Sequence, residues 1–149
     1  MLIRPAVLAD LPAMLDLMRQ LHLDDPALSQ PEPIWRAMLA MSGMTVLVAD
    51  IDGRAVATCT LNIIPHLARG GRPYGLIENV VTDAGHRQQG LGRAVLDAAC
   101  ALAWQADCYK VMLMTGSKLE ATLQFYRQSG FTADKTAFQR RHQSVIRSD

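Results

Sequence analysis

The chain has 149 residues, of which 50% are hydrophobic and 19% are charged, and its formal net charge at pH 7 is +1. This length and balance predict a single globular domain over residues 1–149 with a sizeable core. The near-neutral charge provides no basic field for nucleic acid, and the sequence shows neither a bilayer-spanning apolar stretch nor a signal-peptide pattern. We therefore expect no nucleic-acid or membrane partner and a cytoplasmic location.

The three cysteines, Cys59, Cys100 and Cys108, are odd in number and show no Cys-x-x-Cys spacing. A disulfide framework and a zinc site both need a different pattern, so we expect neither of them and no metal ion. Small buried hydrophobic side chains are the simplest interpretation of these cysteines.

The first half of the chain predicts a strand, two helices and a hairpin. Residues 2–6 form a short apolar stretch typical of a strand, and residues 10–22 repeat apolar side chains at helical spacing, with Asp10 as the expected N-cap. Residues 31–41 have the same spacing. Residues 44–64 change to β-branched and apolar runs around Asp52-Gly53, which is a strong hairpin signal.

The second half predicts three or four further strands and two helices. Residues 74–82 form a strand that is apolar except at Glu78 and Asn79, and the helix that follows the Gly90-Leu91-Gly92 turn runs to about residue 104. Residues 109–115 predict a strand, 119–130 a helix closed by a glycine, and 131–141 one or two last strands. The order β-α-α-β-β-β-α-β-α-β(-β) predicts an α/β mixed sheet with helices on both faces.

The glycine turn between the predicted strand and helix has the chemistry of an anion site. The first backbone N–H groups of a helix have no partner within it, and the helix dipole adds partial positive charge there. A phosphate can accept several of those N–H bonds at once, and Gly90 and Gly92 remove the side chains that would obstruct it. Arg87 and Arg93 flank the turn and can add charge-assisted contacts.

Two common phosphate-binding motifs do not match this turn. A P-loop needs Lys and then Ser or Thr after its last glycine, whereas Gly92 is followed by Arg93 and Ala94. A Rossmann fingerprint needs a third glycine where this chain has Val95. By itself the turn is also compatible with two other interpretations: an ordinary helix N-terminus without a ligand, or a site for some other nucleotide.

Three stretches together resemble the GNAT-type N-acetyltransferases. Residues 80–99 are similar to the family's motif A, whose signature [QR]-x-x-G-x-[GA] matches Arg87-Gln88-Gln89-Gly90-Leu91-Gly92. The stretch LQFYRQSGF resembles the second family motif at Tyr126, Gly130 and Phe131, and IRPAVLADLPAMLDL is similar to the usual start of the family. The resemblance covers nearly the whole chain and implies the GNAT fold, with a central splayed sheet.

The resemblance implies acetyl-CoA as co-substrate. Its pyrophosphate would bind the turn, and Val80 and Val81 would offer strand backbone to the pantetheine arm, which can pair like an added strand. The residues implied at the turn are Arg87, Gln88, Gln89, Gly90, Leu91, Gly92 and Arg93.

Acetyl transfer to an amine needs a proton acceptor and a donor for the departing thiolate. Glu78 is the candidate base or amine anchor, because burial in an apolar central strand would make its carboxylate a stronger proton acceptor. The alternative is an edge or bulge position facing solvent. Tyr126 falls on the tyrosine of the family and is the candidate acid, its alternative being a core residue packed on the sheet.

The acceptor is less well indicated. His66, in a loop with Arg69 and Arg72, could hold an anionic group of the acceptor, and the bland alternative is a solvated loop. His22, beside two aspartates, has the same two interpretations. Asn79 is a further candidate contact, at the position where amino-sugar-phosphate enzymes of the family have a second acid. No Asn occurs between Gly116 and Gly130, where many members carry one that contacts the cofactor.

The sequence thus predicts direct transfer of an acetyl group from acetyl-CoA to a primary amine of a small molecule in a ternary complex. The acceptors considered are amino sugars, amino acids, polyamines and antibiotics. Alternatives are acetylation of a protein N-terminus or lysine, and a non-catalytic acyl-CoA-binding module. The family often dimerises through its last strands, so we expect a homodimer.

Overall fold

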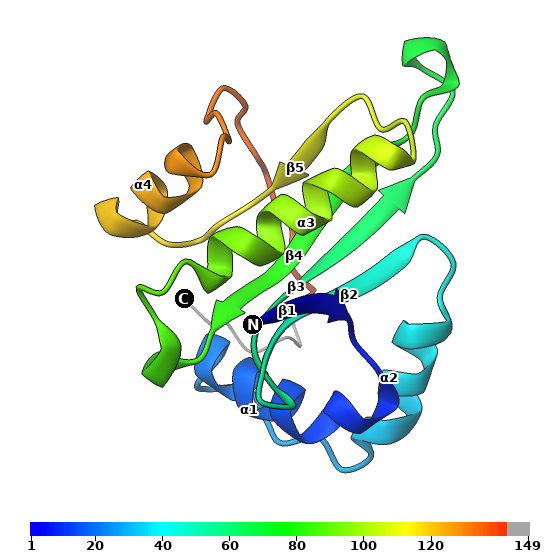
Figure 1. The fold of residues 1–149 in the computed structure, drawn as a ribbon. Helices are drawn as coiled ribbons and strands as arrows, with labels where there is room; N and C mark the ends of the chain where they lie inside the picture. Colours follow the sequence, from blue (N-terminus) through cyan, green and yellow to red (C-terminus); the bar gives the residue numbers. More distant parts are fainter. Residues whose placement is uncertain (143–149) are drawn as a thin grey trace.

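The computed structural model describes residues 1–142 and contains a five-stranded sheet with four α-helices (Figure 1). The strands are β1 (Leu2–Pro5), β2 (Met44–Ile51), β3 (Arg54–Ile64), β4 (Tyr74–Thr82) and β5 (Val111–Leu113), and the helices are α1 (Leu11–Leu21), α2 (Pro31–Ala40), α3 (Leu91–Gln105) and α4 (Glu120–Gln128). Short 3-10 turns lie at Leu8–Asp10, Arg69–Gly71 and Ala84–His86. None of the helices in this described part is long and apolar enough to span a membrane.

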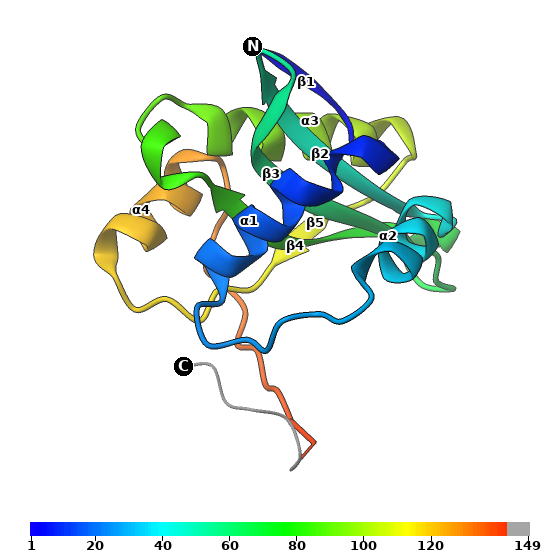
Figure 2. The same ribbon diagram turned by 90° about the horizontal axis from the view of Figure 1, so that it is seen from below.

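The sheet is mixed, with strand order β1-β2-β3-β4-β5. The first four strands pair antiparallel, and β5 pairs parallel to β4. Helix α3 covers one face, and α1 and α2 cover the other, as the two views show (Figures 1 and 2). The prediction of a mixed sheet between helices on both faces is confirmed.

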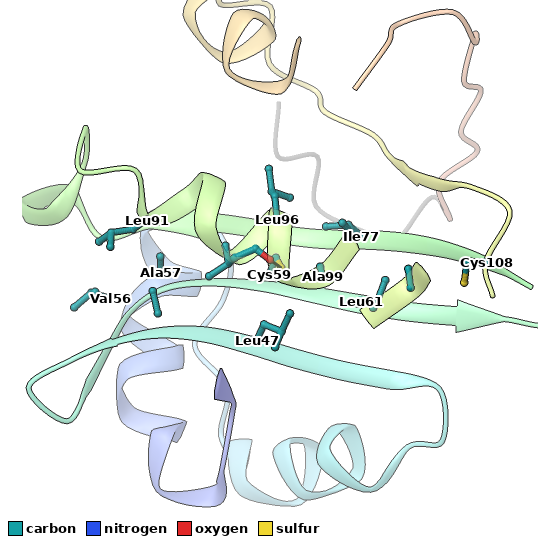
Figure 3. Packing of buried hydrophobic residues seen from close by; sticks show 13 residues of the cluster. Leu47, Val56, Ala57, Cys59, Leu61, Ile77, Leu91, Leu96, Ala99 and Cys108 are labelled. Carbon is teal, nitrogen blue, oxygen red and sulfur yellow. Dashed lines mark hydrogen bonds between the residues drawn. The ribbon is translucent and has the colours of Figure 1, made fainter. Parts of the chain in front are cut away.

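Each face of the sheet has its own core cluster, because side chains alternate along a strand. On β2, Leu47 and Ala49 pack into the cluster under α3, whereas Val46 and Val48 pack into the cluster under α1 and α2. The cluster under α3 also contains residues of β3, β4 and α3, including Cys59, and is shown in Figure 3. Since both faces are covered, β2 and β3 read as nearly continuous apolar runs rather than alternating ones.

The hairpin between β2 and β3 turns where the sequence predicted. Asp52 and Gly53 both have positive φ, 52° and 83°, as a two-residue type I′ turn requires. The amide of Gly53 also donates to the Asp50 carboxylate over 2.8 Å. Local turn chemistry was therefore enough to locate this connection.

The predicted last strand is wrong, and the predicted cap of α1 is correct in position only. Residues 131–142 form no strand, and they run mostly exposed, with Phe138 92% accessible. Because this segment buries little apolar surface, no hydrophobic stabilisation offsets the conformational entropy that it would lose as an ordered strand. Asp10 occupies the N-cap position of α1, but its side chain does not cap the helix, because its carboxylate accepts hydrogen bonds from Arg4 and from the Val7 amide.

Candidate active site

Strands β4 and β5 separate halfway along β4. They pair only over Gly75–Ile77 and Val111–Leu113, whereas β4 continues to Thr82. The edge of β4 beyond Ile77 therefore faces no partner strand on this side. An exposed edge of this kind presents N–H and C=O groups that an extended ligand can pair with.

A β-bulge at Asn79 lies at the start of this open edge. Thr60 pairs with Glu78 and Thr58 with Val81, so β4 has one more residue than β3 across the same interval. Asn79 takes φ of 55°, a left-handed conformation that is rare outside glycine but tolerated by asparagine. The bulge re-aims the backbone and side chains of β4 at the point where the strands part.

The bulge also decides which peptide groups face the open edge. Before it, the Gly75 amide points to the β5 side and donates to the Lys110 carbonyl over 2.9 Å. After it, the Asp83 amide points to β3 and donates to the Val56 carbonyl over 2.8 Å. Because peptide groups alternate between the two edges, those of Val80 and Thr82 face the open edge and those of Val81 face β3.

The turn that leads into α3 carries a row of amides that have no partner within residues 1–142. Gln88 and Gly90 adopt positive φ, 62° and 77°, and the first backbone bond of α3 runs from the Ala94 amide to the Gly90 carbonyl over 3.0 Å. In the described part of the chain, no hydrogen bond is donated by the amides of residues 87–93. Unpaired amides at a helix N-terminus are groups that can donate hydrogen bonds to an anion.

The two glycines of the turn are needed for different reasons. Gly90 has open space around it, so its φ of 77° accounts for the residue. A Cβ on Gly92 would lie 3.2 Å from both the Phe125 ring and the Thr82 hydroxyl. Gly92 therefore lets α3 approach α4 and β4, which is a packing role that the sequence did not indicate.

Arg87 and Arg93 flank this turn as predicted. Arg87 donates from Nε to the Thr82 carbonyl over 3.3 Å, and Arg93 lies 3.6 Å from the exposed Asp97 carboxylate. Both arginines are exposed, so their charge is available at the turn.

The Asp83 carboxylate organises the backbone between β4 and the turn. It accepts hydrogen bonds from Gln20, from His86 Nδ1 over 2.8 Å and from the Gly85 amide over 3.1 Å. The Gln20 amide contributes most to holding the pKa of Asp83 below its usual range, followed by His86. Asp83 therefore stays ionised and keeps this segment in place at neutral pH.

A cavity of about 170 Å³ opens where β4 and β5 separate. It is lined by Leu21, His22, Ile77, Glu78, Asn79, Val80, Leu113, Met114, Thr115, Gly116 and Tyr126. The two predicted catalytic residues, Glu78 and Tyr126, are thus brought together from elements 48 positions apart in the chain.

Glu78 is exposed, so its expected burial is wrong, and the alternative of an edge or bulge position facing solvent is the one the structure has. Glu78 pairs in register with Thr60 of β3, and it lies just beyond Ile77, the last residue of β4 that pairs with β5. Within residues 1–142 its carboxylate takes part in no ion pair or side-chain hydrogen bond. An unpaired carboxylate on a cavity wall is available to accept a proton or to bind an ammonium group.

Tyr126 is half-buried at the other wall of the cavity. Its ring contacts Phe125 and Phe131, with centroid distances of 5.0 and 6.4 Å. Burial raises the pKa of Tyr126, with a smaller contribution from Cys59. The hydroxyl therefore stays protonated at neutral pH and can donate a hydrogen bond.

His66 lies away from this cavity. Its ring contacts Tyr74 and Tyr109 at centroid distances of 5.4 and 5.3 Å, at the N-terminal end of β4. The structure does not place His66 with the other candidate residues, whereas Asn79 and His22 line the cavity. His22 enters because it directly follows the last turn of α1, which sequence spacing alone could not place next to β4.

The loop after β5 contributes residues that the sequence did not single out for the site. Met114, Thr115 and Gly116 line the cavity between β5 and α4. Neither their residue types nor their spacing indicated this position. In residues 1–142, no group of three or more His, Cys, Asp or Glu side chains is arranged to hold a metal ion.

Residues 13–131, which include the open strand edge, the turn and the cavity, match the Acetyltransferase (GNAT) family. The chain belongs to this family.

Similar proteins include a curated glucosamine 6-phosphate N-acetyltransferase of Trypanosoma brucei brucei, which is 42% identical over 81 residues, covering 54% of this chain and 53% of that protein. The chain thus spans about half the length of this curated relative. Among solved structures, a putative acetyltransferase from Agrobacterium tumefaciens is 44% identical, with a TM-score of 0.92 over 95% of this chain and 100% of that one. An acetyltransferase of Trypanosoma brucei is 31% identical, with a TM-score of 0.81 over 95% and 99%.

Proposed function

We propose that this protein transfers an acetyl group from acetyl-CoA to a primary amine of a small molecule, directly and within a ternary complex. One observation carries the proposal. The row of unpaired amides at residues 87–93 and the open edge of β4 lead to a cavity that holds Glu78 and Tyr126. A diphosphate, an extended amide-bearing arm and a reacting group fit these three features in that order.

The residues at the turn suit the diphosphate. The amides of Gln88 to Arg93 point from a helix N-terminus, and Arg87 and Arg93 add positive charge beside them. On β4, the peptide groups of Val80 and Thr82 face the open edge and would pair with the arm, whereas Val81 would contribute only packing.

Acetyl-CoA supplies the acetyl group as an activated thioester. Glu78 would accept a proton from the ammonium group of the acceptor, or hold that group in place. Tyr126 would donate its hydroxyl hydrogen bond to the departing sulfur, a role that needs the protonated phenol. None of the three cysteines lines the cavity, which supports direct transfer without a covalent enzyme intermediate.

For the acceptor we propose a class of compounds, small molecules with a primary amine, and no single compound. The name of the Trypanosoma relative favours an amino sugar, and amino acids, polyamines and antibiotics share the primary amine. Acetylation of a protein N-terminus or lysine is the second candidate. A non-catalytic acyl-CoA-binding module would keep the turn and dispense with Glu78 and Tyr126.

Thiol release from acetyl-CoA across a panel of amines tests the proposal. We expect turnover in the wild type, and kcat reduced about 10- to 100-fold in Glu78→Gln and Tyr126→Phe with CoA binding retained. Glu32→Gln, which alters an exposed carboxylate on α2, is the matched control and should leave turnover unchanged. If both site variants turn over within a few-fold of the wild type, the assigned roles are wrong.

We also propose a homodimer formed through the segment after Gly130. The cytoplasmic location remains a prediction from the sequence. The exposed Phe138 supports this interface, because an aromatic side chain that is 92% accessible gains most from burial against a second copy. Light scattering of the wild type and of Phe138→Ser tests it. A monomeric wild type at micromolar concentration would remove this part of the proposal.

A further inference from the structure

The cavity reaches both faces of the sheet through the gap between β4 and β5. On its lining, Leu21 packs against the cluster under α1 and α2, whereas Tyr126 packs against the cluster under α3. If Tyr126 serves the departing sulfur from the α3 face, the attacking amine has the α1 face to approach from. The side chains on the α1 face are then the ones that meet the acceptor.

Glu78 points to the α1 face. Side chains alternate along a strand, and Ile77 packs into the cluster under α3, so the next residue faces the opposite way. Beyond the bulge, Val81 packs into the cluster under α1 and α2, which also contains Leu17 of α1. Helix α1 thus packs over this part of β4, and its last residue, Leu21, reaches the cavity.

His22, directly after Leu21, is a second titratable side chain on this wall of the cavity. Its backbone is fixed, because its amide donates to the Met18 carbonyl over 2.9 Å and its carbonyl accepts from the Asp25 amide over 3.3 Å. Its half-buried imidazole takes part in no hydrogen bond, ion pair or ring contact within residues 1–142. An imidazole held in this way at a cavity wall can exchange a proton with a bound group.

Glu78 and His22 are suited to two different parts of the same task. A carboxylate attracts an ammonium group and holds it by charge-assisted hydrogen bonds. Imidazole is the side chain that changes between its neutral and protonated forms nearest to neutral pH, which is the property of an efficient proton acceptor. With both groups on one wall, the carboxylate can bind the amine while the imidazole takes its proton.

We propose that His22 accepts the proton of the acceptor's ammonium group, while Glu78 holds that group on the α1 face of the cavity. This inference rests on the proposed acetyl transfer. The first proton passes from the ammonium nitrogen to a ring nitrogen of His22 and from there to solvent. The neutral amine attacks the thioester carbonyl, so that a C–N bond forms and the C–S bond breaks. The second proton lost by the nitrogen replaces the one that the sulfur takes from Tyr126.

The pH dependence of kcat at saturating amine and acetyl-CoA tests this assignment. The titratable side chains on the cavity lining are His22, Glu78 from β4 and Tyr126 from α4, and Asp24 and Asp25 follow His22 in the chain. In the wild type, kcat should rise with pH and level off once imidazole is neutral. In His22→Gln, kcat at neutral pH should be about 10- to 100-fold lower and this inflection should be absent. In Glu78→Gln the inflection should remain, at a lower kcat.

Chemical rescue separates proton transfer from a structural role. His22→Ala removes the ring from the cavity wall, and imidazole added to the buffer should raise its kcat at least about fivefold. Isothermal titration should give the wild-type affinity for CoA in both His22 variants. His66→Gln is the matched control, because His66 is a half-buried histidine whose ring contacts Tyr74 and Tyr109 away from the cavity, and neither kcat nor its inflection should change.

This inference and the proposed function fail in different ways. If CoA binds but no amine releases thiol with the wild type, acetyl transfer is wrong and the role of His22 fails with it. If the wild type turns over and His22→Gln keeps kcat within about twofold, only the role of His22 is wrong. The same holds if His22→Gln loses kcat but keeps the inflection and His22→Ala does not respond to imidazole.

Discussion

Gln20 of α1 and Asp83 at the end of β4 are joined across 63 positions of sequence by a hydrogen bond of 2.9 Å from Nε2 to Oδ1. The carbonyl of the same Gln20 side chain accepts from the Ala84 amide over 2.8 Å. One side-chain amide therefore fixes both the carboxylate and the backbone of the segment that leads into the glycine turn. This contact links the helix at the acceptor side of the cavity to the backbone that would hold the diphosphate.

Replacing Gln20 with Leu should weaken CoA binding about three- to tenfold. Leucine is similar in size to glutamine but makes neither hydrogen bond. The turn would then be less ordered before CoA binds, and ordering it on binding would reduce the binding free energy. Isothermal titration with CoA measures the effect. Gln105→Leu, an exposed glutamine at the end of α3, is the control, and equal affinities in the two variants would show that the contact does not position the turn.

Gly92→Ala should destabilise the protein by about 1–2 kcal/mol. Its Cβ would press on the Phe125 ring and the Thr82 hydroxyl at 3.2 Å, and one of them must move. Urea unfolding measures the loss. The second substitution Phe125→Leu should recover part of it, whereas additive losses in the double variant would argue against this contact.

Gly116→Ala is the control for that series. Gly116 has open space around its Cα and no positive φ, so its free energy of unfolding should change by less than about 0.5 kcal/mol.

Cys59→Ala should keep kcat within about twofold of the wild type, because the proposed transfer needs no thiol nucleophile. Burial raises the pKa of the Cys59 thiol to about 12, and its Sγ donates to the Val95 carbonyl over 3.4 Å. The thiolate is therefore scarce at neutral pH. In the folded wild type, a thiol reagent should label the half-exposed Cys100 before Cys59, and a large loss of kcat in a folded Cys59→Ala protein would indicate a covalent step.

Asp10→Asn should lower the free energy of unfolding by about 2 kcal/mol at pH 7. Hydrogen bonds from Arg4, at 2.8 Å to each carboxylate oxygen, are the largest cause that holds the pKa of Asp10 below its usual value of 3.8. Because the pKa of Asp10 is lower in the folded than in the unfolded protein, its ionised carboxylate stabilises the fold fully above pH 3.8. This stabilisation is lost as the pH falls through the pKa of Asp10 in the folded protein.

The difference between the wild type and Asp10→Asn should therefore shrink as urea unfolding is repeated from pH 7 toward pH 3. Asp16→Asn removes an exposed carboxylate of α1 and should cost less than about 0.5 kcal/mol throughout. A difference at Asp10 that does not depend on pH would mean that the carboxylate charge is not the stabilising group.

Most of the fold was predictable because its signals are local. The hairpin at Asp52-Gly53 and the limits of β4 follow from turn chemistry and from apolar runs, and the structure has them at the predicted residues. The last strand was not predictable in the same way. The strand predicted for residues 131–141 would need a partner edge and a buried face, which local sequence does not determine.

The site shows the same division. Gly90 and Tyr126 could be located from their motifs, since the requirements of a positive-φ turn and a helix face are written in neighbouring residues. The bulge at Asn79 could not, because it exists only as a mismatch of one residue between β3 and β4. That mismatch turns the peptide groups of Val80 and Thr82 toward the gap.

The amino-acid sequence by itself determined the order of the elements, the helix N-terminus with two glycines and the residue types that chemistry needs at β4 and α4. Only the tertiary structure decided that Glu78 is exposed, that His22 lines the same cavity while His66 does not, and that Gly92 packs closely against Phe125. The physical reason is one of range. Turns and amphipathic faces are properties of a few consecutive residues, whereas exposure and juxtaposition depend on the register and packing of segments far apart in the chain.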